Sequence, residues 1–473
     1  MALTHQVRRG SLANLGGAVA SAASTLLLVV LTTRLLSAAD AGRVFAATSV
    51  YLIVTSVLRL GTPTGVVLFV ARTGGDDAEV RRIATLAVRP VLGLSAAAVI
   101  AGVVLFPGWW LLVACLPAGA VLDTLLAVTR GRHRMAPTVV VDRVGRPLCQ
   151  LALTIAAVAH PTVWTLTAAW TLPYLLACLA ALWWTPSLLA HGLPSTAEQR
   201  REFAAFVGPR AVATIIQVCF ARLDIVLVAW LSGPGAAAVY TAATRFVVLC
   251  QFAQQAFATA AEPALARDLS TGRLQSALEH YRVTTTWLAA LLFPALITLA
   301  VLSSVWLRLF GGRYADARWT VLVLVVAMLV AMGVGMVETV LNMAGRSSVV
   351  VGNNALGLVV MVGLDLLLIP RIGALGAATG WATAIVAKNL LGLWQLRGVV
   401  PGSPLTRGWW VAALASAGLV GVLPGAVGAL VGRGPQVIAA AAGVLLLVVV
   451  YLCARSLLLG TAPATVGGET VSP

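Results

Sequence analysis

The chain has 473 residues, of which 60% are hydrophobic and 10% are charged, and its formal net charge is +16. Ordinary soluble domains carry about 25% charged residues, so this composition excludes a typical soluble globular protein. Apolar stretches recur from one end of the chain to the other. Each is about 20 residues long, the length that crosses roughly 30 Å of hydrocarbon. The sequence therefore predicts an all-α polytopic membrane protein.

The first apolar stretch follows Arg8 and Arg9 near the amino terminus. Its apolar core is longer than that of a signal peptide, so we expect a retained first span. Tryptophan pairs at 109–110, 183–184 and 409–410 mark expected membrane interfaces. We expect about fourteen transmembrane helices, over approximately 14–36, 43–70, 84–106, 109–130, 137–159, 162–184, 205–231, 235–262, 283–309, 319–343, 347–369, 373–396, 409–431 and 435–458.

An internal repeat organises these spans. The segment LLSAADAGRVFAATS (35–49) aligns with WLSGPGAAAVYTAAT (230–244). Six predicted spans separate the two copies, and an even number returns the chain to the same side of the membrane, as in parallel repeats. We expect an N-terminal six-helix lobe in 1–190, a C-terminal six-helix lobe in 191–398, two additional helices in 399–460 and a disordered tail in 461–473.

The basic residues are topology signals rather than a nucleic-acid surface. Most loop arginines fall on the side of the amino terminus, which predicts that both termini are cytoplasmic. Lys388 is the only lysine, and no basic tract is interleaved with aromatic residues, so no nucleic-acid partner is expected. The six cysteines have no metal-ligand spacing, no phosphate-binding loop motif is present, and no catalytic constellation emerges. We expect neither an enzyme nor a metal site.

Two spans carry polar stripes that we expect to line a central cavity between the lobes. Their members recur at helical spacing, so each set shares one face of its helix. The alternative is that these groups bond one another across a dry helix interface. The stripes comprise Thr48, Tyr51, Thr55, Arg59 and Thr62 in the second span, and Thr244, Gln251, Gln255 and Glu262 in the eighth.

Charged side chains inside the spans suggest where the function lies, because such groups are costly in hydrocarbon and usually mark a pathway. In CFARLDIVLVAWL (219–231), Arg222 and Asp224 are two positions apart, about 200° around a helix. They cannot neutralise each other within the helix. We expect Arg222 to face the cavity and Asp224 to face a partner on a neighbouring span.

Other charges within the spans leave alternatives open. Asp142 and Arg146 are four residues apart and predict an ion pair, which leaves Arg143 either as a cavity residue or as a group that reaches the membrane surface. Isolated groups in later spans are ion-coupling candidates by default. The alternative is pairing of the acids with Lys388 or with Asn353, Asn354 and Asn389. The candidates are Asp224, Glu338, Asp365 and Lys388.

Five segments resemble the polysaccharide and oligosaccharide-lipid flippases of the multidrug/oligosaccharidyl-lipid/polysaccharide (MOP) exporter superfamily. They are TTRLLSAADAGRVFAATSVYLI (32–53), RLDIVLVAWLSGPGAAAVYTAATRF (222–246), AEPALAR (261–267), RLFGGRYADA (308–317) and IPRIGALGAATG (369–380). The resemblance covers nearly the whole chain. It is specific for the superfamily and weak for the substrate, since these motifs are mostly structural turns.

The resemblance implies two six-helix lobes that move a polyprenyl-(pyro)phosphate-linked oligosaccharide across the bacterial cytoplasmic membrane by alternating access, for cell-surface polysaccharide biosynthesis. It implies no cofactor, energy from an Na⁺ or H⁺ gradient, and pathway partners such as a glycan polymerase or glycosyltransferases, besides membrane lipids. Guanidinium groups suit a pyrophosphate because their planar fork matches its oxygens. The expected substrate-binding residues are Arg34, Arg59, Arg143, Arg222, Arg245, Gln251 and Gln255.

Three alternatives remain open at this point. Arg245 lies off the face that holds Thr244, so it either lines the cavity or caps a lobe interface. A cation-coupled multidrug exporter of the same superfamily would need an acidic cavity around Asp224, Glu338 and Asp365. A membrane glycosyltransferase would need a large outer catalytic loop, and the predicted loops are short.

Overall fold

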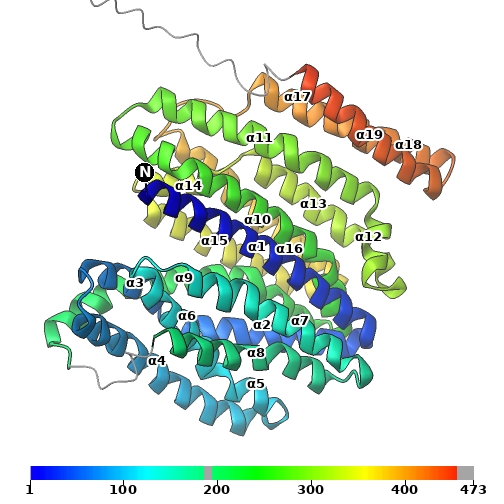
Figure 1. Ribbon diagram of the computed structural model, residues 1–473. Coiled ribbons are helices and arrows are strands. Elements are labelled where there is room, and N and C mark those ends of the chain that lie inside the picture. Colours follow the sequence, from blue (N-terminus) through cyan, green and yellow to red (C-terminus); the bar gives the residue numbers. More distant parts are fainter. Residues whose placement is uncertain (1, 186–193, 455–473) are drawn as a thin grey trace, which may run out of the picture. The chain divides into compact units, whose positions relative to one another are not determined.

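The computed structural model describes residues 2–185 and 194–454, and within them every regular element is a helix (Figure 1). The predicted all-α membrane fold is confirmed. The described chain forms two compact units. One unit holds the described residues of Met1–Arg245, Leu309–Tyr314 and Met361–Ala377, and the other holds the described residues of Phe246–Arg308, Ala315–Val360 and Ala378–Pro473.

In the first unit, α2 is the helix on which the neighbours assemble. It packs against α6, α8 and α9, while α3 and α4 pack against α6, and α1 packs against α7 and the π-helical turn η2 before it. Tyr51, Leu122 and Tyr174 belong to the buried apolar core between these helices. The helices are α1 (Ala2–Leu35), α2 (Ala38–Leu58), α3 (Thr62–Arg72), α4 (Asp77–Leu105), α5 (Trp110–Ala114), α6 (Leu116–Gly131), η2 (Thr138–Gly145), α7 (Arg146–Ala156), α8 (Val163–Trp184), α9 (Ala197–Leu231) and the start of α10 (Pro234–Ser270).

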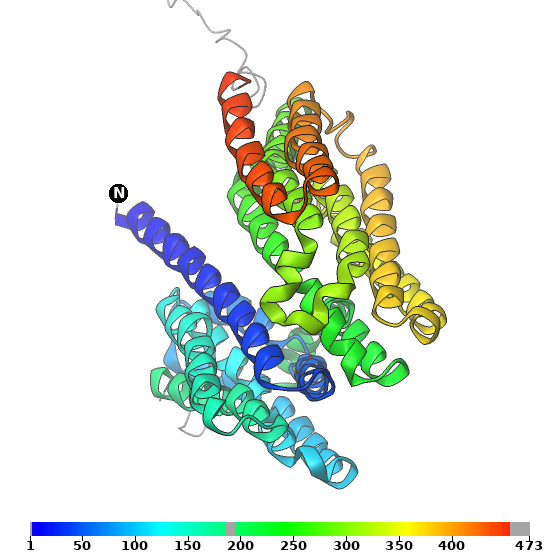
Figure 2. The same cartoon turned by 90° about the vertical axis from the view of Figure 1, so that its right-hand side faces the viewer.

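In the second unit, α11 packs against α13 and α17. The last helices lie side by side, as the orange and red ribbons of Figure 2 show. They correspond to the two additional spans predicted near the carboxyl end. The second unit also contains the rest of α10. Three of the helices that follow, α12, α15 and α16, have part of their length in the first unit. The helices are α11 (Leu274–Val301), α12 (Ser303–Phe310), α13 (Arg318–Gly333), α14 (Val337–Met343), α15 (Ser347–Ile372), α16 (Ala374–Leu396), α17 (Arg407–Ser416), the π-helical turn η6 (Ala417–Val422), α18 (Leu423–Leu430) and α19 (Arg433–Cys453).

Eleven helical stretches in the described residues are long and apolar enough to cross a membrane, so the predicted number of about fourteen is not confirmed. The three other predicted spans fall on α1, on η2 with α7, and on α16. Of these, α1 contains the apolar stretch Ala20–Leu35, and α7 has 11 residues. The predicted lobe boundaries stay predictions, and the predicted tail, 461–473, lies outside the described residues.

The two copies of the sequence repeat form equivalent local structures, each a turn that starts a long helix. Ser37 caps α2, because its hydroxyl accepts a hydrogen bond from the Asp40 backbone N–H at 3.1 Å. In the second copy, Gly233 has φ of 90° and Pro234 opens α10. The starts of α2 and α10 meet closely. A Cβ atom added to Gly42 would lie 1.6 Å from the carbonyl oxygen of Pro234.

Replacing Gly42 with alanine is therefore expected to push α2 away from the start of α10. Overpacking of this kind costs about 1–3 kcal/mol of unfolding free energy. The measurement is thermal unfolding of the detergent-purified protein. Gly93→Ala on α4 is the matched control, because nothing lies within 4 Å of the new methyl group. The control should be neutral or slightly stabilising, and equal behaviour of the two variants would contradict the close approach.

Candidate substrate-binding cavity

A cavity of about 220 Å³ lies inside the first unit. Its wall is built from α1, α2, α7, α8, α9 and the first turns of α10. Most of these helices are the central ones of the unit, so the cavity lies deep among the spans. Its polar lining comprises Thr25, Thr32, Thr48, Ser49, Arg146, Gln150, Thr154, Arg222, Thr241 and Arg245.

The charges in this wall all have one sign. Arg146, Arg222 and Arg245 line the cavity, and no carboxylate of the described residues does. Each comes from a different helix, respectively α7, α9 and α10. Arg146 is paired with Asp142, and Asp224 lies close enough for its charge to act on Arg222 and Arg245. Three guanidinium groups against two carboxylates leave a net positive charge, which favours an anion in a low-dielectric environment.

Arg146 is fixed in place by its neighbours. Its Nε donates to Asp142 Oδ1 at 2.9 Å, which confirms the predicted pair. Its Nη1 donates to Gln150 Oε1 at 3.3 Å, and its guanidinium lies over the Tyr174 ring at 4.7 Å from the centroid. Asp142 belongs to the π-helical turn η2, which precedes α7. Such turns are often found at functional sites, and this one presents the carboxylate to Arg146.

Arg222 and Asp224 differ in their contacts, although the charge of Asp224 acts on Arg222. Arg222 lines the cavity and forms no hydrogen bond or ion pair with any residue in the described part of the chain. Asp224 is buried outside the cavity wall and accepts a hydrogen bond from Tyr240 Oη at 2.6 Å. The Arg222 guanidinium is thus left for water or for a ligand.

Arg245 is held by its own helix. Its Nε donates to the Thr241 carbonyl at 2.9 Å, and its Nη2 donates to Thr244 Oγ1 at 3.4 Å. Only 6% of the residue is exposed, yet it lines the cavity. The Thr241 hydroxyl beside it is buried and has no hydrogen-bond partner among the described residues. This end of the cavity therefore offers one cation and one unused hydroxyl.

A second buried group is acidic. Asp365 on α15 is fully buried, and neither of its carboxylate oxygens has a hydrogen-bond partner within residues 2–185 and 194–454. It lies in the first unit, as do Asp224 and Tyr240. A bare buried carboxylate is costly, so it requires a proton or a cation. The predicted coupling candidates Asp224 and Asp365 thus share this unit.

The other arginines predicted for the cavity lie elsewhere in the first unit. Arg34 is exposed, and its Nε donates to the Leu309 carbonyl at 2.8 Å. Arg59 pairs with Asp123 at 3.3 Å, and Asp123 also accepts from Arg130 at 3.0 Å. Arg143 is half-buried on η2, where its Cβ faces Gly17 of α1. None of the three lines this cavity.

Most of the polar stripe on α2 faces protein instead of the cavity. Tyr51 is fully buried and donates to the Cys115 carbonyl at 3.0 Å, and Thr62 lies 3.1 Å from the Thr124 hydroxyl, oxygen to oxygen. Thr55 donates to the carbonyl of Tyr51 within the helix. Of this stripe only Thr48 lines the cavity. The other members of the stripe form hydrogen bonds within α2 or with neighbouring helices, which is the alternative considered for the stripe.

The remaining predicted residues belong to the second unit. Gln251 and Gln255 are exposed on α10. Lys388 Nζ donates to Glu338 Oε1 at 2.8 Å and to Asn354 Oδ1 at 2.9 Å, which is the pairing considered as the alternative for these groups. Asn353 is paired instead with Gln395, donating to its Oε1 at 2.6 Å.

The predicted substrate-binding residues did not include several residues of the cavity wall, among them Arg146, Gln150, Trp170 and Tyr174. Gln150 donates to the Trp170 carbonyl at 2.7 Å, and Trp170 packs on Tyr174 with ring centroids 5.2 Å apart. The available signal was the four-residue spacing of Arg146 with Gln150 and of Trp170 with Tyr174, which puts each pair on one helix face. That spacing does not show that both faces, one on α7 and one on α8, line the same cavity.

Comparisons with known proteins agree with this architecture. Residues 209–370 match the family model MatE. No curated protein sequence matches the chain. A solved structure of the lipid II flippase MurJ in an inward closed conformation is similar at a TM-score of 0.74 with 13% identity, over 95% of this chain and 99% of that one.

Two further structures show the same architecture. An inward-facing multidrug resistance MATE family transporter of the MOP superfamily has a TM-score of 0.66 and 15% identity, over 79% of this chain and 94% of that one. A MOP superfamily transporter from Pyrococcus furiosus has a TM-score of 0.58 and 16% identity, over 84% of this chain and 95% of that one. The chain has the fold of the MOP transporters.

At the level of the fold, this result agrees with the resemblance that the sequence segments indicated. The fold alone does not identify the transported substrate, because structures with this fold include a flippase and a multidrug transporter. For the Pyrococcus furiosus MOP protein, reverse polarity of the binding pocket was taken to suggest a different function. The chemistry of the cavity, rather than the fold, therefore has to identify the cargo.

Proposed function

We propose that the protein is a flippase that moves a polyprenyl-(pyro)phosphate-linked oligosaccharide across the cytoplasmic membrane by alternating access, for cell-surface polysaccharide biosynthesis. The observation that supports this most is the cavity wall, to which the described part of the chain contributes Arg146, Arg222 and Arg245 and no carboxylate. Such a wall attracts a phosphate or pyrophosphate group and repels a cationic drug.

The three arginines suit different parts of this task. Arg146 is pre-oriented by Asp142 and Gln150, so little side-chain entropy is lost when it binds an anion. Arg222 forms no hydrogen bond or ion pair among the described residues, so its N–H donors are free to bind a pyrophosphate. Arg245 and the unused Thr241 hydroxyl add donors nearby. Guanidinium groups stay charged even when buried, which keeps the attraction throughout a transport cycle.

Sugar recognition has its own candidates in the same wall. Trp170 is half-buried in the wall, and an aromatic ring there can stack on the apolar face of a sugar ring. The Thr32 and Thr48 hydroxyls donate to the carbonyls of Leu28 and Val44 in their own helices. Their oxygens therefore remain available as acceptors for sugar hydroxyl groups.

We further propose that Asp224 and Asp365 couple transport to an Na⁺ or H⁺ gradient. The Asp365 carboxylate lacks any donor among the described residues, so a bound proton or cation satisfies it. Glu338 with Lys388 is a second coupling candidate, because loss of charge on Glu338 would release the Lys388 ammonium. In this account both termini are cytoplasmic, and a glycan polymerase or glycosyltransferases act beside the flippase.

A cation-coupled multidrug exporter is the second candidate function. It is favoured by the match of residues 209–370 to the MatE family model and by the buried acids Asp224 and Asp365. Resistance to cationic drugs on overexpression, lost in Asp365→Asn, would support it. The arginine lining of the cavity argues against it. Arg146 is paired with Asp142, but Arg222 and Arg245 form no ion pair among the described residues and would repel an entering cation.

The flippase proposal predicts that the double change Arg222→Gln and Arg245→Gln slows transport by at least about tenfold, because charge-assisted hydrogen bonds contribute about 1.5–3 kcal/mol each. The measurement is the movement of a fluorescent polyprenyl-pyrophosphate oligosaccharide across vesicles containing the reconstituted protein. Arg210→Gln is the matched control, because Arg210 lies on α9 but outside the cavity wall. Unchanged transport in the double variant would remove the proposed role of these arginines.

The coupling proposal predicts that Asp365→Asn abolishes the stimulation of transport by an imposed ion gradient while leaving the protein folded. The neutral amide has the same shape and removes a buried charge that has no described partner. The same vesicles are used, with and without Na⁺ and pH gradients. Glu338→Gln is the comparison variant. Full stimulation in Asp365→Asn, with loss in Glu338→Gln, would move the coupling site to the Lys388 pair.

A further inference from the structure

A second set of arginines meets at the amino-terminal ends of α4 and α9, outside the proposed cargo cavity. Arg82, Arg89 and Arg200 line a pocket of about 270 Å³, together with the hydroxyl-bearing residues Thr85 and Ser195. Within residues 2–185 and 194–454, no carboxylate contributes to this lining. The proposed flippase activity makes no use of these residues.

The sequence brings these side chains together through helix periodicity. Arg82, Thr85 and Arg89 are three and seven residues apart, which places them on one face of α4. Arg200 comes from the first turn of α9, whose start is fixed by the capping box of Thr196 and Gln199. Two rigid helices therefore define the pocket, rather than loops.

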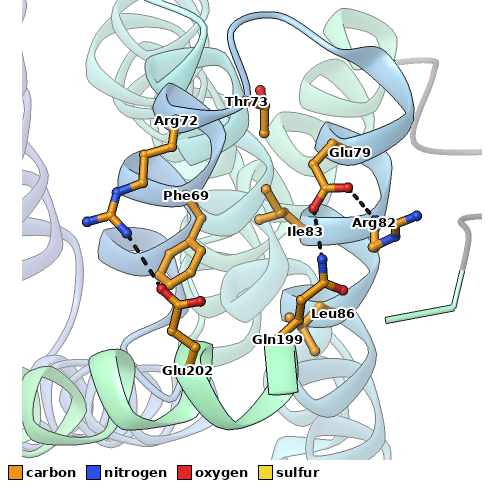
Figure 3. A pocket seen from close by; sticks show the side chains of 9 residues that line it. All are labelled: Phe69, Arg72, Thr73, Glu79, Arg82, Ile83, Leu86, Gln199 and Glu202. Carbon is orange, nitrogen blue, oxygen red and sulfur yellow. Dashed lines mark hydrogen bonds and ion pairs between the residues drawn. The ribbon is translucent and has the colours of Figure 1, made fainter. Parts of the chain in front are cut away.

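Hydrogen bonds beside the pocket hold Arg82 in place, whereas Arg89 and Arg200 remain available to bind a ligand. Figure 3 shows Glu79 between Arg82 and Gln199. Arg82 Nη1 lies 2.5 Å from Glu79 Oε2, and Gln199 Nε2 donates to Glu79 Oε1 at 3.2 Å. Arg89 and Arg200 are exposed and have no ion pair to any described residue. After Glu79 compensates Arg82, two positive charges remain at the pocket.

The position of the pocket along α4 indicates which anion reaches it. No charged residue follows Arg89 up to the end of the helix at Leu105. Leu92, Ile100 and Val103 share the face of Arg89 and are exposed. The pocket thus stands at the polar end of a long apolar surface, the level at which the phosphates of membrane lipids lie.

We propose that this pocket binds the phosphate of an anionic membrane lipid, with the acyl chains of that lipid lying along the exposed apolar face of α4. Arg89 and Arg200 hold the phosphate oxygens by charge-assisted hydrogen bonds, and Thr85 and Ser195 add hydroxyl donors. A free phosphate ion offers the same head-group contacts but none along Leu92 and Ile100. A lipid bound here fixes the end of α4 to that of α9.

The test uses the full-length, delipidated protein in detergent, titrated with dioctanoyl phosphatidylglycerol and followed by native mass spectrometry. Arg89→Gln with Arg200→Gln is expected to raise the Kd by about tenfold or more, since each arginine near an anionic lipid contributes about fivefold. The matched control is Arg81→Gln with Arg201→Gln, which removes the same charge from adjacent positions outside the pocket. The control should stay within about twofold of the unaltered protein. Arg200→Gln alone should give an intermediate Kd.

Three results would overturn the proposal. Equal weakening in both double variants would show general attraction to basic helix ends and no defined pocket. Equal binding of dioctanoyl phosphatidylcholine would show that the net negative charge of the lipid is not recognised. Inorganic phosphate that competes as well as the lipid would assign the pocket to a free anion. Each result is independent of the flippase assay, because none of these residues lines the cargo cavity.

Discussion

The structure depends on how each guanidinium group within the membrane spans is neutralised. The chain has 32 basic and 16 acidic residues, so carboxylates cannot pair with every arginine. Asp123 serves both Arg59 and Arg130, and Asp142 serves Arg146. Arg222 is left without a described partner. Its side chain lies in the cavity wall, where water or an anionic cargo can reach it.

Helix packing determines where in the fold the excess of arginines over carboxylates is located. The close approach at Gly42 brings the start of α10 to α2, and Arg245 lies three turns along that helix. The π-helical turn η2 brings Asp142 to Arg146 at the start of α7. The aromatic cluster of Tyr51, Trp170 and Tyr174 fills the space behind Arg146. Packing thus positions the charges, and the charges give the cavity its polarity.

Much of this could be predicted from the sequence, and the limits have physical causes. Composition and the length of the apolar stretches predicted the all-helical membrane class, because a helix of about 20 apolar residues is long enough to cross the membrane. Helix periodicity predicted that Arg222 and Asp224 lie on different faces of their helix and that Asp142 pairs with Arg146. Periodicity does not tell which neighbour a polar face meets. The stripe with Tyr51 and Arg59 therefore suggested a cavity, although both side chains bond to the helix with Cys115, Gly119 and Asp123.

The central claim is that the cavity recognises a phosphorylated polyprenyl group by its negative charge. The most direct measurement compares binding of farnesyl diphosphate and farnesol to the full-length protein in detergent, across a range of salt concentrations. The account predicts that the diphosphate binds at least about tenfold more tightly, with an affinity that falls as salt rises. Equal affinity for the two compounds, or tighter binding of a lipophilic cation, would contradict it.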